Sequence, residues 1–467
     1  MSAARTILHN FVNLSAGELA ARLAAFAGFA HLASVLGSSE FGRVGLVMTI
    51  VSYLFLPVMQ GFDSVGIRDV ARDRARLRAY AGTIVAIRTL SALLTISAVA
   101  AVTALVAPAP PMRSLLLRFS LTLLPAAWSL KWAFQAVEQT RPVAASGIVA
   151  QLLFAAGAFT VRGPEQLLLV PLYSLAGEAA GAGVLASLFI RRFGWPQPVF
   201  EACSWKELLG ESTPLAVSTV LGTLLFNFDV LALGWFQPAA AVGLYTAVYK
   251  LVLLFSTLLT LFQLSLFPTL ARAYAGGREL APIADRVLRF VTAAFVLLAF
   301  AGMLLGRRLL EFLFGPEYAA GAAALRILMW SLPWMALRSV FRIILVSYNL
   351  QRLDLRAVAA GTFTNIALDL ALVPGLGTVG AAISTLSSEF VIFFLSYRYI
   401  WQRVERLGVL RHLVRPLGAS ILLFAVGSAL VSTPLPVQAA AAATVYVAGL
   451  FVLRGLTWKE IEGLYRG

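Results

Sequence analysis

Charged side chains inside long apolar stretches are the residues of this sequence best placed to do chemistry. A charge at the centre of a membrane-spanning helix costs on the order of 2.5–3.5 kcal/mol, so it is expected to face a cavity or a partner. There a cation can bind an anion, and a carboxylate can bind a proton or a metal cation. The candidate cations are Arg22, Arg88 and Lys250, and the candidate carboxylates are Asp229, Glu178, Glu389 and Asp369.

Structural alternatives stay open for these charges. Arg22 follows Glu18 by one turn, so a local i,i+4 pair competes with an anion site. Asp229 and Lys250 are expected at similar depth on consecutive helices, where a salt bridge is the leading interpretation. Arg88 is near enough to a helix end to extend its head group to the interface.

The remaining carboxylates also have two interpretations. Glu178 and Glu389 are expected near the middle of their helices, where pairing with polar neighbours is as plausible as proton or cation coupling. Asp369 is expected close to an interface, where water can hydrate it.

Motifs for enzymatic chemistry are missing from the sequence. It contains no GxxxxGK[ST] phosphate loop, and its three histidines have no metal-ligand spacing. The single Cys203 excludes an internal disulfide. We therefore expect no catalytic residues, no metal and no cofactor.

The composition predicts an integral membrane protein. Hydrophobic residues make up 60% of the 467 residues and charged residues 13%, whereas a soluble domain is about 45–50% apolar and about 25% charged. The apolar stretches are continuous and rich in Leu and Ala, which favours α-helices over a barrel of alternating strands. Fourteen spanning helices are expected near 11–36, 43–66, 81–106, 113–137, 143–161, 167–190, 212–235, 242–270, 286–306, 318–346, 354–373, 377–401, 413–432 and 436–454.

Basic residues indicate the orientation. The net charge is +15, and most Lys and Arg residues fall in alternate loops, as expected when both chain ends are cytoplasmic. The start of the chain has no cleavable-signal pattern. A basic run after the second helix is expected to contact anionic headgroups of the inner leaflet rather than a nucleic acid. Its arginines are Arg68, Arg72, Arg74, Arg76 and Arg78.

Weak matches at an offset of about 200 residues indicate an internal repeat. Gly42–Arg72 matches Gly243–Arg272, and "SLAGEAAG" around Glu178 matches "STLSSEFV" around Glu389. A six-helix unit repeated in parallel is a transporter architecture with a site between the halves. The expected organisation is an N-terminal six-helix lobe (1–190), a cytoplasmic linker (191–211), a C-terminal six-helix lobe (212–406), and two extra helices with a tail (407–467).

Several segments resemble polysaccharide (O-antigen-type) flippases. They are "ASVLGSSEFGRVGLVMTIVSYL" with "GFDSVGIRDVARDR", "NFDVLALGWFQPAAAVGLYTAVYKLV" with "LFPTLAR", and "LFGPEYAAGAAALRIL" with "GTFTNIALDLALVPGLGTVGAAISTLSSE". The resemblance implies the multidrug/oligosaccharidyl-lipid/polysaccharide (MOP) exporter fold, with two six-helix bundles and alternating access. It also implies transport of a polyprenyl-pyrophosphate-linked oligosaccharide to the outer leaflet of a bacterial or archaeal cytoplasmic membrane, for O-antigen, lipopolysaccharide or exopolysaccharide synthesis.

The resemblance also suggests roles and partners. Arg22, Arg88 and Lys250 would bind the pyrophosphate or acidic sugars, and the four carboxylates would couple transport to H⁺ or Na⁺. Membrane lipids and a polysaccharide polymerase are expected partners. The alternatives are a multidrug antiporter of the same superfamily, a lipid II flippase, or, from another class, a membrane-embedded glycan polymerase or ligase.

Overall fold

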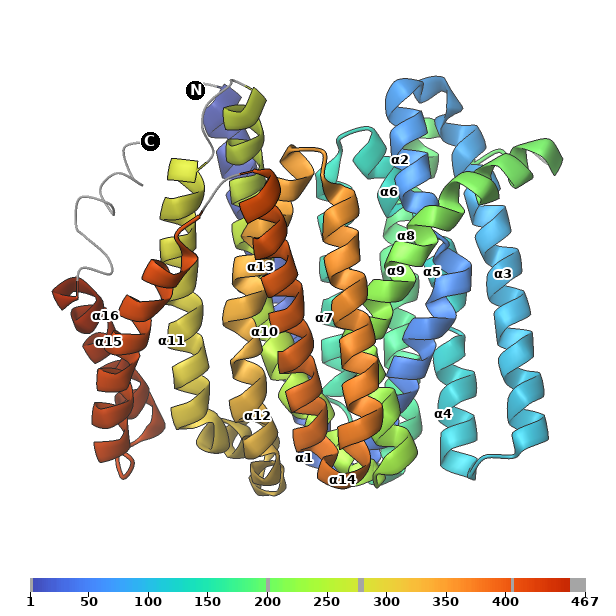
Figure 1. Cartoon of the computed structure of the whole chain (residues 1–467). Helices are drawn as coiled ribbons and strands as arrows, with labels where there is room; N and C mark the ends of the chain where they lie inside the picture. Colours follow the sequence, from blue (N-terminus) through green and yellow to red (C-terminus); the bar gives the residue numbers. More distant parts are fainter. Residues whose placement is uncertain (1–2, 199–201, 276–280, 405–406, 454–467) are drawn as a thin grey trace. The chain divides into compact units, whose positions relative to one another are not determined.

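Helices make up the regular structure of this chain. The computed structural model describes residues 3–198, 202–275, 281–404 and 407–453, and every regular element in these ranges is an α-helix or a short 3-10 helix (Figure 1). Eleven helical segments in these ranges are long and apolar enough to cross a membrane. An α-helix satisfies its own backbone polar groups, which lipid cannot do. The prediction of an all-α, multi-pass membrane protein is confirmed.

The chain divides into two compact units. Unit 1 contains Met1–Gly234 and Pro238–Gly243, and unit 2 contains Trp235–Gln237 and Leu244–Gly467. The elements that begin in unit 1 are α1 (Ala3–Met59), α2 (Phe62–Arg72), η1 (Arg74–Arg76), α3 (Leu77–Val106), α4 (Pro110–Ser120), α5 (Leu123–Ala127), α6 (Lys131–Ala136), α7 (Thr140–Ala158), η2 (Pro164–Leu169), α8 (Val170–Phe193), α9 (Ala202–Phe236) and α10 (Ala239–Ala275). Those wholly in unit 2 are α11 (Ala281–Phe314), η3 (Pro316–Gly321), α12 (Ala322–Met329), α13 (Ser331–Ser347), α14 (Gln351–Arg403), α15 (Val409–Ala429) and α16 (Leu435–Val452).

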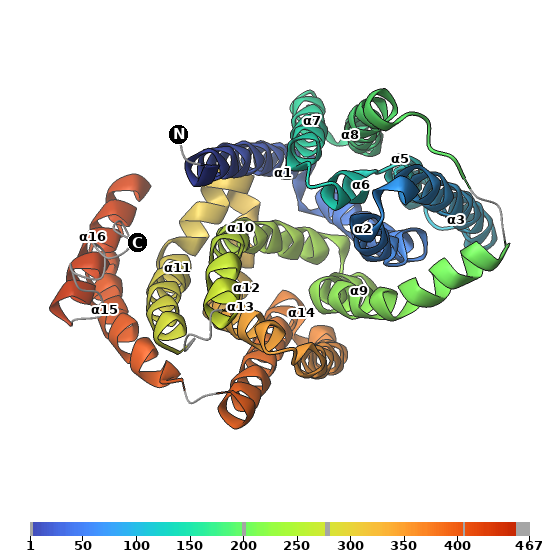
Figure 2. The same ribbon diagram turned by 90° about the horizontal axis from the view of Figure 1, so that it is seen from above.

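Small residues bring the helices of unit 1 together. Helix α7 packs against both α1 and α8 (Figure 2). A Cβ atom on Gly177 of α8 would lie 2.5 Å from the carbonyl oxygen of Ala150 of α7, and one on Gly181 would lie 2.9 Å from that of Ser146. Without a hydrophobic drive between helices in lipid, such close backbone approach supplies the packing energy.

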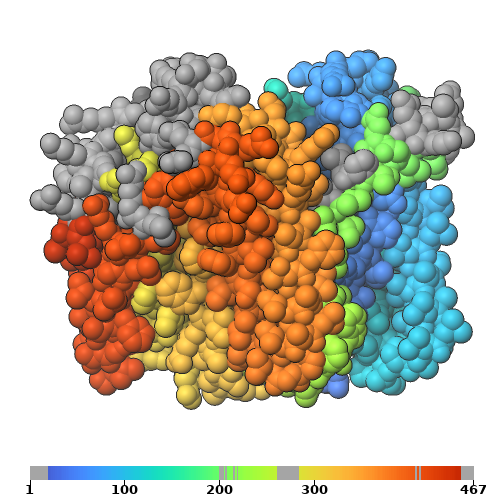
Figure 3. All heavy atoms as spheres, in the orientation of Figure 1, coloured from blue at the N-terminus to red at the C-terminus, as the bar shows by residue number. Residues whose placement is uncertain are grey.

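The last two helices are attached to α11 in unit 2 (Figures 2 and 3). The Tyr446 hydroxyl of α16 donates a hydrogen bond of 2.6 Å to the carbonyl of Ala293 in α11. Near the other end of α11, Arg308 donates to the carbonyls of Val431 (3.2 Å) and Thr433 (2.9 Å). Arg308 therefore holds the turn between α15 and α16.

Two of the expected gaps between helices, the one after residue 36 and the one after residue 373, are breaks within continuous helical segments. Gly37 interrupts α1 at φ 74°, and Gly377 interrupts α14 at φ 54°, a region that favours glycine. At the second break, the Gln237 amide donates to the carbonyls of Val373 (2.9 Å) and Pro374 (3.2 Å). A side chain of unit 2 thus takes over hydrogen bonds that the helix loses there.

Prolines divide two of the predicted helices. The single helix expected at 113–137 is three pieces, α4, α5 and α6, and the one expected at 318–346 is η3, α12 and α13. Helix α4 ends just before Leu121, four residues before Pro125, and α12 ends at Met329, four residues before Pro333. A proline ring clashes with the carbonyl of the residue four positions before it, which is Leu121 for Pro125 and Met329 for Pro333.

The breaks between helices expected at 191–211 and 271–285 are shorter in the structure, because α9 begins at 202 and α10 continues to 275.

Two helix ends have the same backbone geometry at an offset of 211 residues. After α6, Glu138 adopts φ 62°, and after α13, Asn349 adopts φ 58°. The matching hydrogen bonds run from Gln139 N to Phe134 O (2.8 Å) and from Leu350 N to Leu345 O (2.7 Å). Each closes its helix in a Schellman-type cap. This shared geometry supports the internal repeat that the weak sequence matches indicated.

The repeat also has a reciprocal contact. The sequence match aligns Gly42 of α1 with Gly243 of α10, and both residues lie in unit 1. A Cβ on Gly42 would lie 1.9 Å from the Ala239 carbonyl oxygen, and one on Gly243 would lie 1.8 Å from that of Ser38. Ser38 and Ala239 are separated by the same 201 residues as the glycines. Positions that the sequence match aligns therefore approach each other reciprocally.

The Gly42 crossing predicts a stability effect. Gly42→Ala forces the two backbones apart, and overpacking of this kind costs about 1–3 kcal/mol. We expect the thermal unfolding midpoint of the purified protein in detergent to fall.

The matched control is Gly147→Ala in α7, where a Cβ would meet no atom within 4 Å. It should leave the midpoint unchanged or raise it slightly, because Ala is the better helix former. Equal behaviour of the two variants would contradict a tight crossing.

Candidate functional site

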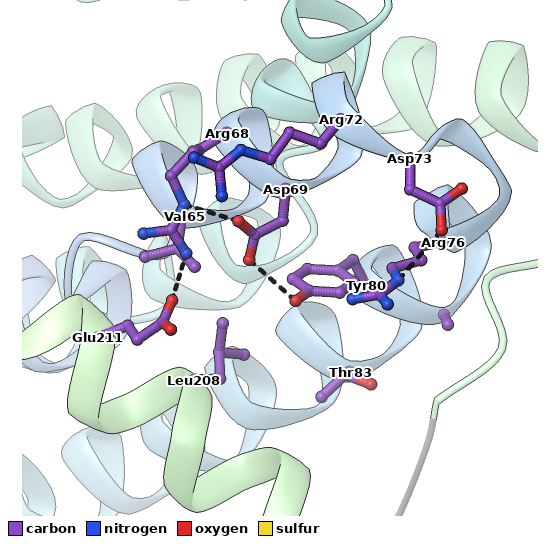
Figure 4. A pocket seen from close by; sticks show the side chains of 11 residues that line it. Val65, Arg68, Asp69, Arg72, Asp73, Arg76, Tyr80, Thr83, Leu208 and Glu211 are labelled. Carbon is purple, nitrogen blue, oxygen red and sulfur yellow. Dashed lines mark hydrogen bonds and ion pairs between the residues drawn. The ribbon is translucent and has the colours of Figure 1, made fainter.

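The arginine run folds into a polar pocket at one end of unit 1. Arg68 and Arg72 lie on α2, Arg74 and Arg76 on η1, and Arg78 in the first turn of α3. We call the cavity of about 410 Å³ beside them the arginine pocket. It is lined by Val65, Arg68, Asp69, Arg72, Asp73, Arg76, Ala79, Tyr80, Thr83, Leu208 and Glu211 (Figure 4).

Acidic residues neutralise much of the arginine pocket. Arg68 Nε lies 2.6 Å from Asp69 Oδ1, and the same guanidinium is paired with Glu211 of α9 (Figure 4). The Tyr80 hydroxyl donates to Asp69 Oδ2 at 3.0 Å. Arg76 Nε lies 3.2 Å from Asp73 Oδ2. The pocket is therefore a network of ion pairs that joins α2, α3 and α9.

The arginines of the run thus fall into two groups. Arg68 and Arg76 have carboxylate partners, and Arg78 donates through Nε to the Trp195 carbonyl at 3.1 Å. Arg72 and Arg74 are exposed and make no hydrogen bond or ion pair with another described residue. Contact with lipid headgroups stays a prediction, and it applies best to these two.

Arg88 is buried and paired rather than extended to the interface. Its side chain is 1% exposed, and Nη2 donates to Asp63 Oδ1 at 2.9 Å. Its guanidinium carbon also lies 5.9 Å from the centre of the Phe62 ring. The Asp63 side chain is 50% exposed. The alternative in which Arg88 extends to the interface does not hold, because Asp63, which the sequence did not single out, offers a carboxylate inside the fold.

Glu389 has a cationic partner that the sequence did not single out. Arg338 lies within α13 and holds Glu389 of α14 through two contacts, Nε to Oε2 at 2.5 Å and Nη2 to Oε1 at 3.2 Å. The two side chains are 13% and 2% exposed. A bidentate pair of this kind is strong and geometrically specific. An arginine within an apolar helix is the signal that would have identified it.

Glu178 differs from its repeat counterpart. It is exposed, and within the described ranges it makes no hydrogen bond or ion pair. Yet it lies on the same face of α8 as Ala182, Leu185 and Phe189, which are all buried. Glu178 thus occupies an exposed position on a helix face that is buried from Ala182 to Phe189.

Asp369 is buried instead of exposed at an interface as expected. It is 0% exposed in α14, and so is Asn365 one turn before it. Neither polar atom of the Asn365 side chain has a hydrogen-bond partner among the described residues. Buried amides of this kind usually have a partner. The buried amide of Asn365 and the buried carboxylate of Asp369 thus lie one turn apart on α14.

The other candidates are less defined by the geometry. Arg22 is half-buried in α1, and the side chain of Glu18 lies outside the described ones. Asp229 is 1% exposed, and its Oδ1 accepts a hydrogen bond of 2.8 Å from the Val230 N–H. Asp229 belongs to unit 1 and Lys250 to unit 2, so their salt bridge stays a prediction.

Comparisons with known proteins identify the family. The family model described as "Polysaccharide biosynthesis protein" matches residues 7–274, and the MatE model matches 214–371. The chain is 31% identical over 188 residues to "Probable flippase AglR" of Haloferax volcanii, a match that covers 38% of each chain.

Solved structures share the fold. "Lipid II flippase MurJ, inward closed conformation" has a TM-score of 0.78 at 11% identity, covering 96% of this chain and 99% of that one. An inward-facing "multidrug resistance MATE family transporter of the MOP superfamily" has a TM-score of 0.62 at 12% identity, covering 82% and 95%. The fold is thus shared with a transporter of the MOP superfamily. The resemblance to polysaccharide flippases is confirmed at the level of the family: the chain belongs to the polysaccharide biosynthesis protein family.

Proposed function

We propose that this protein is a flippase that moves a polyprenyl-pyrophosphate-linked oligosaccharide from the cytoplasmic to the outer leaflet by alternating access. The family match over residues 7–274 carries the proposal. The matched segment of the probable flippase from Haloferax volcanii and the fold of the lipid II flippase agree with it. The sugars and the pyrophosphate cannot cross about 30 Å of hydrocarbon unaided, whereas a polyprenyl tail can stay in lipid.

The proposed architecture has fourteen crossings with both ends in the cytoplasm. Two of the eleven candidate spans, Leu19–Arg72 and Gln351–Arg403, are each long enough for two crossings, and they break at Gly37 and Gly377. The pieces α4 to α6 supply the remaining one. We assign them to six-helix lobes at 1–190 and 212–406, a linker at 191–211, and two further helices and a tail at 407–467.

The headgroup site is proposed around the intramembrane cations. Arg22 and Lys250 are the favoured residues for the pyrophosphate or acidic sugars. Arg88 is a weaker candidate, because Asp63 already compensates its charge. The exposed Arg72 and Arg74 are proposed to contact inner-leaflet headgroups, and polymerase components are proposed partners.

Coupling to H⁺ or Na⁺ is proposed at Asp369. The unpartnered polar atoms of Asn365, one turn away, favour this place, since carbonyl and carboxylate oxygens are ligands for hard cations. The exposed Glu178 and the buried Asp229 are the next candidates. Glu389 is assigned a structural role, because Arg338 occupies both of its oxygens.

A multidrug antiporter is the second candidate function. The MatE match over residues 214–371 and the multidrug transporter structure favour it. A drug antiporter would act on free cationic compounds and leave the glycolipid pool unchanged.

Depletion of the protein followed by mass spectrometry of extracted lipids tests the main proposal. We expect polyprenyl-pyrophosphate oligosaccharide to accumulate while surface polymer disappears, because the completed lipid stays in the inner leaflet. The accumulated species would identify the substrate. Cells with an unchanged lipid pool and new sensitivity to cationic drugs would instead support the antiporter.

Asp369→Asn tests the coupling site. The purified protein is placed in vesicles with the accumulated glycolipid, and flipping is followed by access of a membrane-impermeant lectin to the sugar. We expect the variant to lose acceleration by a Na⁺ or H⁺ gradient, because the neutral amide no longer attracts the cation. Asp354→Asn at the start of the same helix is the control, since Asp354 pairs with the exposed Arg342 at 3.5 Å. A gradient response retained in Asp369→Asn would contradict the assignment.

A double-mutant cycle tests the structural role of Glu389. Arg338→Met or Glu389→Leu alone leaves one buried charge unpaired and should cost about 3–5 kcal/mol of unfolding free energy. The double variant should regain most of that stability in thermal unfolding, and it should also flip substrate. A stable but inactive double variant would assign Glu389 to coupling instead.

A further inference from the structure

A short segment after α8 lies across α3 in unit 1. Gly194 ends α8 at φ 85°, and residues 195–198 follow without regular structure. A Cβ on Gly82 of α3 would lie 2.3 Å from the carbonyl carbon of Gln197 and from Pro198 N. Arg78 secures the segment, since its carbonyl accepts from the Gln197 N–H at 3.0 Å while its Nε donates to Trp195 O.

This segment encloses one end of an apolar groove of about 420 Å³ along α3. We call it the α3 groove. Its floor includes Gly82, Ala86, Thr89 and Leu93, spaced as one helical face. At about 1.5 Å per residue, the floor is about 16 Å long. That length is about half of the hydrocarbon core, so the groove fits one leaflet.

The walls of the α3 groove face outward. Leu90, Leu93, Trp128 and Trp195 are 49%, 50%, 40% and 66% exposed, and the α3 segment forms part of the surface of unit 1 (Figure 3). In a membrane protein such a surface lies against lipid chains. A hollow lined by apolar atoms gains dispersion energy when a chain fills it.

A cation lies at one end of the groove. Arg78 precedes Gly82 by one turn on the same face of α3. Its Nη1 and Nη2 make no hydrogen bond to any residue that the structure describes, which leaves four N–H donors for a ligand. Arg74, which is exposed and lies four residues before Arg78 in η1, adds a second positive charge. Tryptophans such as Trp195 are typical of the membrane–water boundary.

We propose that the α3 groove binds one bilayer phospholipid with an anionic headgroup, its phosphate on Arg78 and one acyl chain along Gly82 to Leu93. The charge of Arg78 and Arg74 selects the anionic headgroup. The volume is that of a single small-molecule ligand and too small for a partner helix about 10 Å across. The site is a resident lipid site beside the transport path, and it does not rest on the proposed transport.

Native mass spectrometry of the purified full-length protein, titrated with phosphatidylglycerol and with phosphatidylcholine, tests the site. We expect one phosphatidylglycerol to bind more tightly than any phosphatidylcholine. Arg78→Gln should weaken that binding about fivefold, the equivalent of about 1 kcal/mol for one basic residue near a headgroup. Ala86→Phe should abolish it by filling the groove.

The matched controls are Arg162→Gln, an exposed arginine at the opposite end of unit 1, and Ala98→Phe, an exposed position on α3 beyond the groove. Both should retain the tight phosphatidylglycerol. Unchanged binding in Ala86→Phe would overturn the site, and equal affinity for the two phospholipids would overturn the headgroup contact. If the groove instead retained undecaprenyl phosphate in competition with phosphatidylglycerol, it would belong to the substrate path.

Discussion

Backbone polar groups that enter hydrocarbon must be satisfied within the protein, and the structure depends on this constraint. It explains the absence of strands from the described ranges and the positions of side chains where a helix is interrupted. Gln237 donates to carbonyls beside the Gly377 break, and Arg308 donates to carbonyls of the turn between α15 and α16. Polar residues at these places stabilise irregular backbone that lipid cannot solvate.

Charge pairing follows from the same low polarity. Arg88 with Asp63 and Arg338 with Glu389 are neutralised within their own units. In the arginine pocket, Asp69 of α2, Glu211 of α9 and Asp73 between α2 and η1 pair with Arg68 and Arg76. Because their charges are compensated within the protein, these paired residues are less available to bind an ion or an anionic group. The residues that stand out are the exposed Glu178 on α8, and Asn365 and Asp369, which are both buried one turn apart on α14.

The tight crossing of α1 and α10 involves residues that the internal sequence match aligns. The weak sequence match aligns Gly42 with Gly243, and each glycine lies against a backbone carbonyl close to the other, that of Ala239 or of Ser38. The α3 groove is formed in part by the segment after α8, since Trp195, Pro196 and Pro198 contribute to its lining.

Composition and hydrophobic pattern by themselves determined the helical class, the membrane location and most helix positions, because a spanning helix needs only a long apolar run. Motif resemblance determined the family. The breaks before Pro125 and Pro333 were missed, because length alone cannot separate one kinked span from several pieces. Only the tertiary structure decided which charges are paired: Asp63 and Arg338 are distant in sequence from Arg88 and Glu389, and contacts between helices are not encoded in local spacing.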